Sequence, residues 1–171
     1  MKKLLTMLVI LCCATQTVAR NNSDNSISVF IIDNTPTNVR EQPNGKIAGK
    51  LPVIDTGYIV ELDECQKGWC SVIDIREAAE DKEIKIKSTT GKLWLHHSVL
   101  GFHTRNYGKQ KITIRNKPQN NAPAVYSFNE EQSLCLLDFN DNWAKVKTWD
   151  SKHTGWIERK WVCENPLTTC P

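Results

Sequence analysis

The chain has 171 residues, enough for one ordinary domain or two small ones, and a formal net charge of +3 at pH 7. Lys2 and Lys3 supply part of that charge and lie in a segment that we expect to be removed, so the rest of the chain is close to neutral. A nearly neutral chain has no electrostatic attraction for nucleic acid or for an anionic membrane surface, so the charge argues against both as partners.

The first nineteen residues have the pattern of a secretory signal peptide. Residues 2–3 are basic, residues 4–14 are apolar, and residues 17–19 place small side chains at the −3 and −1 positions of a cleavage site. The apolar run is short for a membrane-spanning helix. Lipid attachment at Cys12 or Cys13 is disfavoured because Leu11 stands where such sites take a small residue. We therefore expect an exported bacterial protein, periplasmic or extracellular, with no membrane span in the mature chain.

In an exported protein the cysteines are expected to form disulfides, because disulfides form and persist in oxidising compartments. Five cysteines remain after cleavage, and an odd number leaves at least one unpaired or bound to another molecule. They are Cys65, Cys70, Cys135, Cys163 and Cys170.

Short β-strands alternate with turn residues along the first part of the mature chain. Residues 20–26 are rich in Asn and Ser and predict a flexible leader. Runs of β-branched and aromatic residues separated by Pro, Asn, Asp and Gly predict strands at 27–32, 38–40, 47–52 and 58–63. Residues 73–92 predict a lengthened hairpin, with a possible single helical turn at 76–80. No long amphipathic helix is evident, and the fold class is all-β.

Two pairs of cysteines flank short connections. Cys65 and Cys70 enclose a Gly-containing turn between two strands, and a hairpin brings such positions within bridging distance. Cys163 and Cys170 enclose a Pro-containing tail that a bridge would close into a loop. We predict these two disulfides, with Cys135 reduced and buried at a core position. The rival pairing Cys135–Cys163 stays open from the sequence.

The chain repeats one pattern after 75 residues, since Val39-Arg40 with Pro43 is matched by Ile114-Arg115 with Pro118. Each copy continues through an apolar strand to one Trp and closes on a second Trp beside an aliphatic residue. Two copies indicate two small domains in tandem rather than a solenoid. The expected segments are a signal peptide (1–19), a leader (20–26), a first domain (27–101), a linker (102–110), a second domain (111–163) and a tail (164–171).

These motifs together resemble the bacterial SH3-like domain. The first copy shows the opening Asn-Val-Arg, the Gly-Trp-x-x-Val strand and a final Trp-aliphatic strand, carried by residues 38–40, 68–72 and 91–95. The second copy repeats them at residues 114–115, 143–146 and 155–157, without the Asn. The resemblance covers most of the mature chain, and its motifs are structural. It implies two small β-barrels in tandem, of a type often appended to cell-wall enzymes as a targeting module that contacts peptidoglycan peptides.

Aromatic residues are the candidate ligand-binding side chains. Partly exposed aromatic rings suit stacking on sugars or peptides, although each ring also has a simpler role in sealing a barrel. The candidates are Tyr58, Trp69, Trp94, Tyr126, Trp143 and Trp156. Structural roles are predicted for Arg40, Pro43, Arg115 and Pro118, because a planar guanidinium beside a turn holds backbone carbonyls well.

We find no catalytic constellation in the sequence. Cysteine and histidine are both present, but the thiols are expected to be paired or buried, and a Cys plus His signal is weak. The adjacent His96 and His97 point to opposite faces of a strand, which disfavours a metal site. No phosphate loop, zinc-type Cys spacing or serine elbow is present. We expect no enzyme, no catalytic residue, no metal and no cofactor.

Three functions remain from the sequence. The leading one is an exported non-catalytic module that binds cell-wall peptide or glycan. The second is an exported protein–protein interaction or inhibitor module. The third is a small exported hydrolase.

Overall fold

The computed structural model describes residues 25–168 and 170. Half of the chain is β-strand, and the described residues contain no helix of seven or more residues, so the all-β class is confirmed. Two single 3₁₀ turns are present, η1 (His97–Val99) and η2 (Arg159–Trp161). The predicted signal peptide and most of the leader lie outside the described residues.

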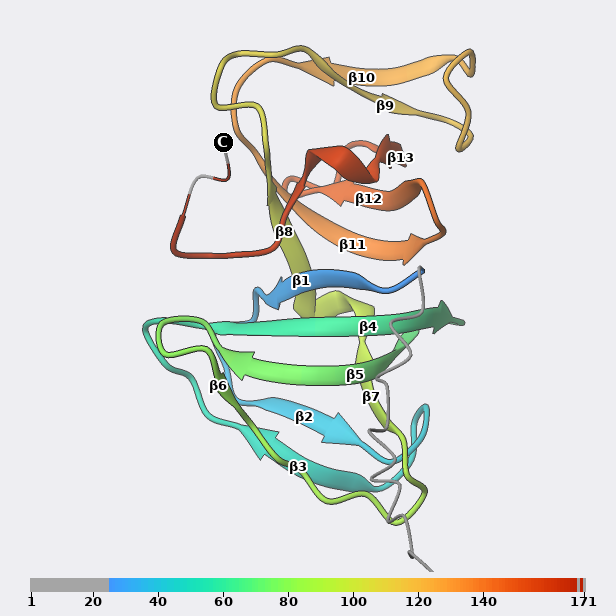
Figure 1. The fold of residues 1–171 in the computed structure, drawn as a ribbon. Helices are drawn as coiled ribbons and strands as arrows, with labels where there is room; N and C mark the ends of the chain where they lie inside the picture. The colour runs from blue at the N-terminus through green and yellow to red at the C-terminus, as the bar shows by residue number, and fades with distance from the viewer. Residues whose placement is uncertain (1–24, 169, 171) are drawn as a thin grey trace, which may run out of the picture.

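Eight strands form the first part of the chain (Figure 1). They are β1 (Ile27–Ile31), β2 (Thr37–Arg40), β3 (Ile47–Leu51), β4 (Tyr58–Gln66), β5 (Trp69–Glu77), β6 (Lys82–Glu83), β7 (Leu93–His96) and β8 (Leu100–Thr104). Six more follow: β9 (Ile112–Arg115), β10 (Ala124–Phe128), β11 (Ser133–Phe139), β12 (Trp143–Thr148), β13 (Thr154–Glu158) and β14 (Val162–Cys163).

All strands belong to one antiparallel sheet in the order β10-β9-β13-β12-β11-β8-β1-β4-β5-β7-β2-β3, with β14 paired to β8 and β6 paired to β5. The two end strands, β10 and β3, do not pair with each other, so the sheet is not closed into a barrel. Hydrogen bonding therefore gives one open sheet where the sequence predicted two separate closed barrels.

Strand β8 joins the two parts of the molecule. It pairs with β1 on one edge and with β11 on the other, and Gly101 faces Phe30 and Cys135. A Cβ at Gly101 would lie 2.7 Å from the carbonyl oxygen of Leu134, so this close approach requires glycine. Phe102 is fully buried. The predicted linker thus begins inside a core strand, and the irregular connection is confined to residues 105–111.

The lengthened hairpin is present, but its predicted helical turn is absent. Arg76 and Glu77 complete β5 and pair with β6. Asp81 has φ 52° and supplies the tight turn between these strands. Residues 76–80 have moderate helix propensity, but they do not form a helical turn. The residues before and after the turn continue the pairing of β5 with β6, and this pairing outweighs the local preference.

One hydrophobic core runs through both parts and includes Val39, Val60, Phe102, Ile114 and Val146. In β11 the buried side chains are Leu134 and Leu136, whereas Cys135 is half-buried. The prediction that Cys135 is buried in the core register is therefore wrong. Aligning the repeats by sequence misplaced β11 by one residue, and a one-residue shift moves every side chain to the other face.

Candidate functional site

Most of the aromatic candidates do not present a ring to solvent. Tyr58, Trp69, Trp94 and Trp143 are 6–9% exposed and pack in or beside the core. The sequence argument assumed strict alternation, but Trp69, Cys70 and Ser71 are buried in succession at the start of β5. Both faces of the strand are covered there, so period-two reasoning fails. Tyr126 and Trp156 are half-buried, and of these two Tyr126 lines a cleft.

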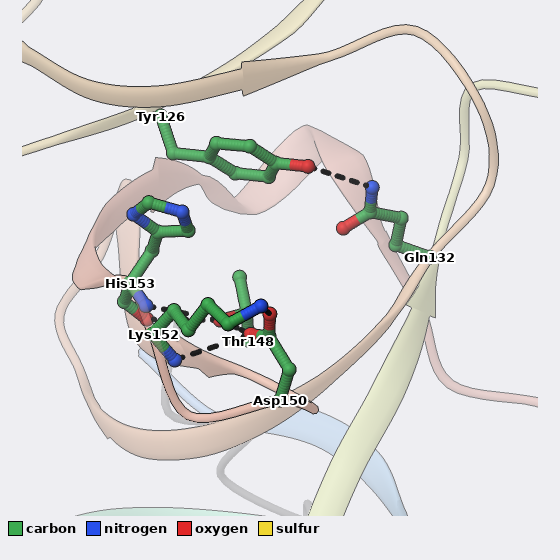
Figure 2. Close-up of polar contacts among 6 residues, drawn as sticks. All are labelled: Tyr126, Gln132, Thr148, Asp150, Lys152 and His153. Atoms are coloured by element: carbon green, nitrogen blue, oxygen red, sulfur yellow. Dashed lines mark hydrogen bonds and ion pairs between the residues drawn. The ribbon is translucent and has the colours of Figure 1, made fainter.

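The cleft has a volume of about 630 Å³ and lies between the end strand β10 and the loop that joins β12 to β13. Figure 2 shows Tyr126 and Gln132 on one side of an open space, with Thr148, Asp150 and Lys152 on the other. Its walls combine rings, hydroxyls, an amide and charges. The lining residues are Tyr126, Gln132, Ser133, Thr148, Trp149, Asp150, Lys152 and His153.

The loop on one side of the cleft is held by its own polar contacts. The Thr148 hydroxyl donates to Asp150 Oδ1 at 2.7 Å, and the Lys152 backbone N–H donates to the same oxygen at 3.1 Å. Lys152 Nζ lies 3.1 Å from Asp150 Oδ2. The hydrogen bond from Thr148, followed by those from Lys152, lowers the pKa of Asp150 to about 2. Asp150 is therefore ionised at neutral pH, and the loop offers a fixed pair of opposite charges.

Two stacked rings join the loop to the opposite wall. Tyr126 stacks on His153 with ring centroids 4.3 Å apart and an interplanar angle of 4°. The Tyr126 hydroxyl accepts a hydrogen bond from Gln132 Nε2 at 3.4 Å, which fixes the ring (Figure 2). Trp149 borders the same cleft and is 63% exposed. Free apolar ring surface beside polar groups is the usual composition of a small ligand site.

Sequence reasoning missed Trp149, Asp150 and Lys152. The available signal was an aromatic residue within the short polar connection between two predicted strands, since loops carry binding residues more often than strands do. The predicted strand positions led instead to rings that the fold buries.

The two arginines of the repeat have equivalent contacts. Arg40 Nη1 donates to the carbonyl of Gly45 at 2.6 Å, and Arg115 Nη1 donates to the carbonyl of Ala122 at 2.8 Å. The Arg40 guanidinium also lies 5.7 Å from the centroid of the Trp69 ring. Neither guanidinium lines the cleft. Pro43 and Pro118 belong to the turns that these arginines brace.

Both predicted disulfides are present, Cys65–Cys70 and Cys163–Cys170, and Cys135 is the free thiol among the described residues. Burial raises the pKa of Cys135, so the thiol is protonated at neutral pH and unsuited to nucleophilic attack. Within residues 25–168 and 170 no cluster of His, Cys, Asp and Glu is arranged to hold a metal ion. The same residues include no helix long and apolar enough to span a bilayer.

Comparison with known proteins finds similar solved structures but no similar sequence family or curated protein. No family model matches the chain, and no curated protein does. Two solved structures from Trichomonas vaginalis are similar, each with a TM-score of 0.31. NlpC2 is 14% identical, with 81% of this chain and 48% of that chain covered. NlpC1 is 16% identical, with 91% of this chain and 50% of that chain covered. The chain thus spans about half the length of either protein.

This comparison corrects one expectation. The sequence led us to expect that the chain is not an enzyme, and the similarity to the structures named NlpC1 and NlpC2 contradicts that expectation. We therefore no longer assign an absence of activity to the chain. At a TM-score of 0.31 the similarity transfers no active-site residue to it either.

Proposed function

We propose that the chain is an exported protein of two SH3-like units that binds peptidoglycan of the cell envelope through the cleft between β10 and the 149–153 loop. The repeated motifs of the two parts support the SH3-like assignment, and the two disulfides fit an oxidising compartment. The observation that carries the proposal is the exposed Trp149 ring beside a cleft with fixed polar groups.

The cleft combines the two kinds of contact that a wall fragment requires. Peptidoglycan presents apolar sugar and peptide surfaces together with amide, hydroxyl and carboxylate groups. The Trp149 indole offers a flat apolar surface, and Lys152, whose side chain is 74% exposed, retains free N–H donors for a carboxylate or carbonyl. The stacking of Tyr126 of β10 on His153 of the loop holds the two sides of the cleft in place without a cost in side-chain ordering on binding.

Co-sedimentation of the mature protein with purified insoluble sacculi tests the proposal. We expect the wild type to bind and Trp149→Ala to bind about tenfold more weakly, the scale of loss at an aromatic anchor. Tyr107→Ala is the matched control, because Tyr107 is a 73% exposed aromatic residue outside the cleft lining. Failure of the wild type to bind sacculi would contradict the proposal and favour a protein as the partner. Equal loss in both variants would contradict the assignment of the site.

A further inference from the structure

A serine and a histidine meet at the edge of the cleft, in a contact that the proposed binding function does not use. Ser133 opens β11 of the second repeat (β9–β13) and lines the cleft. It lies directly opposite His103 of β8 in the antiparallel pair, and Ser133 Oγ is 3.0 Å from His103 Nδ1. Both side chains are half-buried, so the fold holds the contact while the serine still borders the open cleft.

A buried polar network fixes the backbone next to this pair. The Thr104 N–H donates to the carbonyl of Gln132 at 3.0 Å, and the Gln132 N–H donates to Thr104 Oγ1 at 2.9 Å. The Thr104 hydroxyl donates to Asn106 Oδ1 at 2.8 Å, and both of these residues are buried. Thr104 follows His103 and Gln132 precedes Ser133, so the network holds both stretches of main chain that carry the pair. Such a network rigidifies the residues that it connects, and a reacting pair requires fixed geometry.

The contact has the geometry of a serine nucleophile beside its general base. A serine hydroxyl is a weak nucleophile until a base within hydrogen-bond reach, about 2.6–3.2 Å, takes its proton. In the His103 tautomer that is protonated at Nε2, the Nδ1 atom accepts the Ser133 proton. The serine hydroxyl is therefore poised for activation at the wall of a ligand-sized cleft.

The same cleft holds groups that can stabilise a negative oxygen. The Tyr126 hydroxyl accepts a hydrogen bond from Gln132 Nε2, so its own proton is left for another acceptor (Figure 2). Lys152 lines the same cleft and brings a positive charge. Both groups suit the oxyanion that forms when a carbonyl carbon becomes tetrahedral. Nucleophile, base and oxyanion donors thus border one space.

We propose that the Ser133–His103 pair hydrolyses esters of short carboxylic acids. Ser133 Oγ bonds to the ester carbonyl carbon as its proton passes to His103 Nδ1, and the C=O electron pair moves to the carbonyl oxygen. When the tetrahedral intermediate collapses, the C–O bond to the alcohol breaks and the alcohol leaves with the proton from His103. Water then gives a proton to His103, and its hydroxide adds to the acyl carbon. The second collapse releases the carboxylic acid, and Ser133 recovers its proton from His103.

An ester fits this pair better than an amide. Within residues 25–168 and 170, the hydrogen-bond and ring contacts of the His103 side chain are with Ser133 and with the Phe30 ring, and none is with a carboxylate. In a Ser-His-Asp triad the carboxylate stabilises the imidazolium that forms, so this pair lacks that contribution. An alcohol leaves more readily than an amine, and an ester therefore demands less of the pair.

The composition of the cleft limits the acid part of the ester to a short one. Among the described residues that line the cleft, none has an aliphatic hydrocarbon side chain, so a long acyl chain has no apolar channel. The exposed Trp149 ring offers its flat surface to the alcohol part. The proposal uses the cleft of the proposed function and adds an activity to it.

Labelling of the mature wild-type protein with a fluorophosphonate tests the nucleophile. The reagent forms a bond to an activated serine oxygen with loss of fluoride, and we expect its adduct on Ser133 in a mass-spectrometric peptide map. Ser98 is the internal control, because its hydroxyl lies 2.7 Å from His96 Nδ1 but outside the cleft lining. Absence of the adduct on Ser133, or equal labelling of Ser98, would overturn the proposal.

Hydrolysis of p-nitrophenyl acetate by variants tests the base. Ser133→Ala and His103→Gln are each expected to lose about 100-fold in kcat/KM, the scale of general acid–base catalysis. Glutamine still hydrogen-bonds to Ser133 but cannot take its proton, so a merely structural contact would survive His103→Gln. Ser98→Ala is expected to stay within about twofold of wild type. A wild-type rate in Ser133→Ala or His103→Gln would overturn the proposal. Both assays use soluble reagents, so their outcome is independent of binding to sacculi, which tests the proposed function.

Discussion

Replacing Arg40 by Lys tests whether the repeated arginine is structural. The substitution keeps the positive charge but removes the planar fork that reaches the Gly45 carbonyl at 2.6 Å. A hydrogen bond from a charged donor contributes about 1.5–3 kcal/mol. Lysine retains part of that interaction, so we expect a loss of about 1–2 kcal/mol in the free energy of unfolding. For a chain of this size the loss lowers Tm by about 2–8 °C.

Thermal unfolding followed by circular dichroism measures the effect, and Arg115→Lys should behave alike because Arg115 holds the Ala122 carbonyl at 2.8 Å. Arg76→Lys is the control, since Arg76 pairs with Asp74 and the exposed Asp81 at the surface. A surface pair contributes about 0–1 kcal/mol, so this variant should melt close to wild type. An Arg40→Lys protein that melts like wild type but no longer binds sacculi would refute the structural role.

Three further predictions follow from the chain. The exported protein is expected to begin at or near Arg20, so an intact Met1 or a lipid on Cys12 or Cys13 in its mass spectrum would contradict the signal peptide. Cys135 is expected to react slowly with iodoacetamide at pH 7 and faster as the pH rises, because burial raises its pKa; a Cys135–Cys163 peptide in a non-reducing digest would contradict its free state. Asp150 contributes stability above its unfolded pKa of 3.8, and this contribution is lost as the pH falls towards its folded pKa of about 2. The Tm difference between wild type and Asp150→Asn should therefore be constant at neutral pH, shrink as the pH falls below 3.8 and vanish below about pH 2.

Local chemistry made much of the fold predictable. The Gly-containing turn between Cys65 and Cys70 predicts a hairpin, and the hairpin places the two thiols for a bridge that the structure contains. The position of Arg40 before a turn predicts a hydrogen bond to a nearby carbonyl, and that contact is present. In each case the determining groups lie within a few residues of one another, so no knowledge of the distant chain is needed.

The site was harder to predict because it depends on contacts between distant segments. Trp69 and Trp149 are both aromatic residues beside a hairpin, but Trp69 is covered by a neighbouring strand and Trp149 is not. Which of them is exposed follows from the order of the strands in the sheet, which the periodicity of the sequence does not report. The same limit explains Cys135, since its face depends on the pairing of β11 with β8.

The first part of the chain has a physical role in the stability of the second part. The second repeat spans roughly the length at which a hydrophobic core alone is marginal. Strand β8 pairs with β11 of that repeat and with β1 of the first part, and one core cluster extends across both. Burial of Phe102 and Leu134 between the two parts therefore stabilises each against the other.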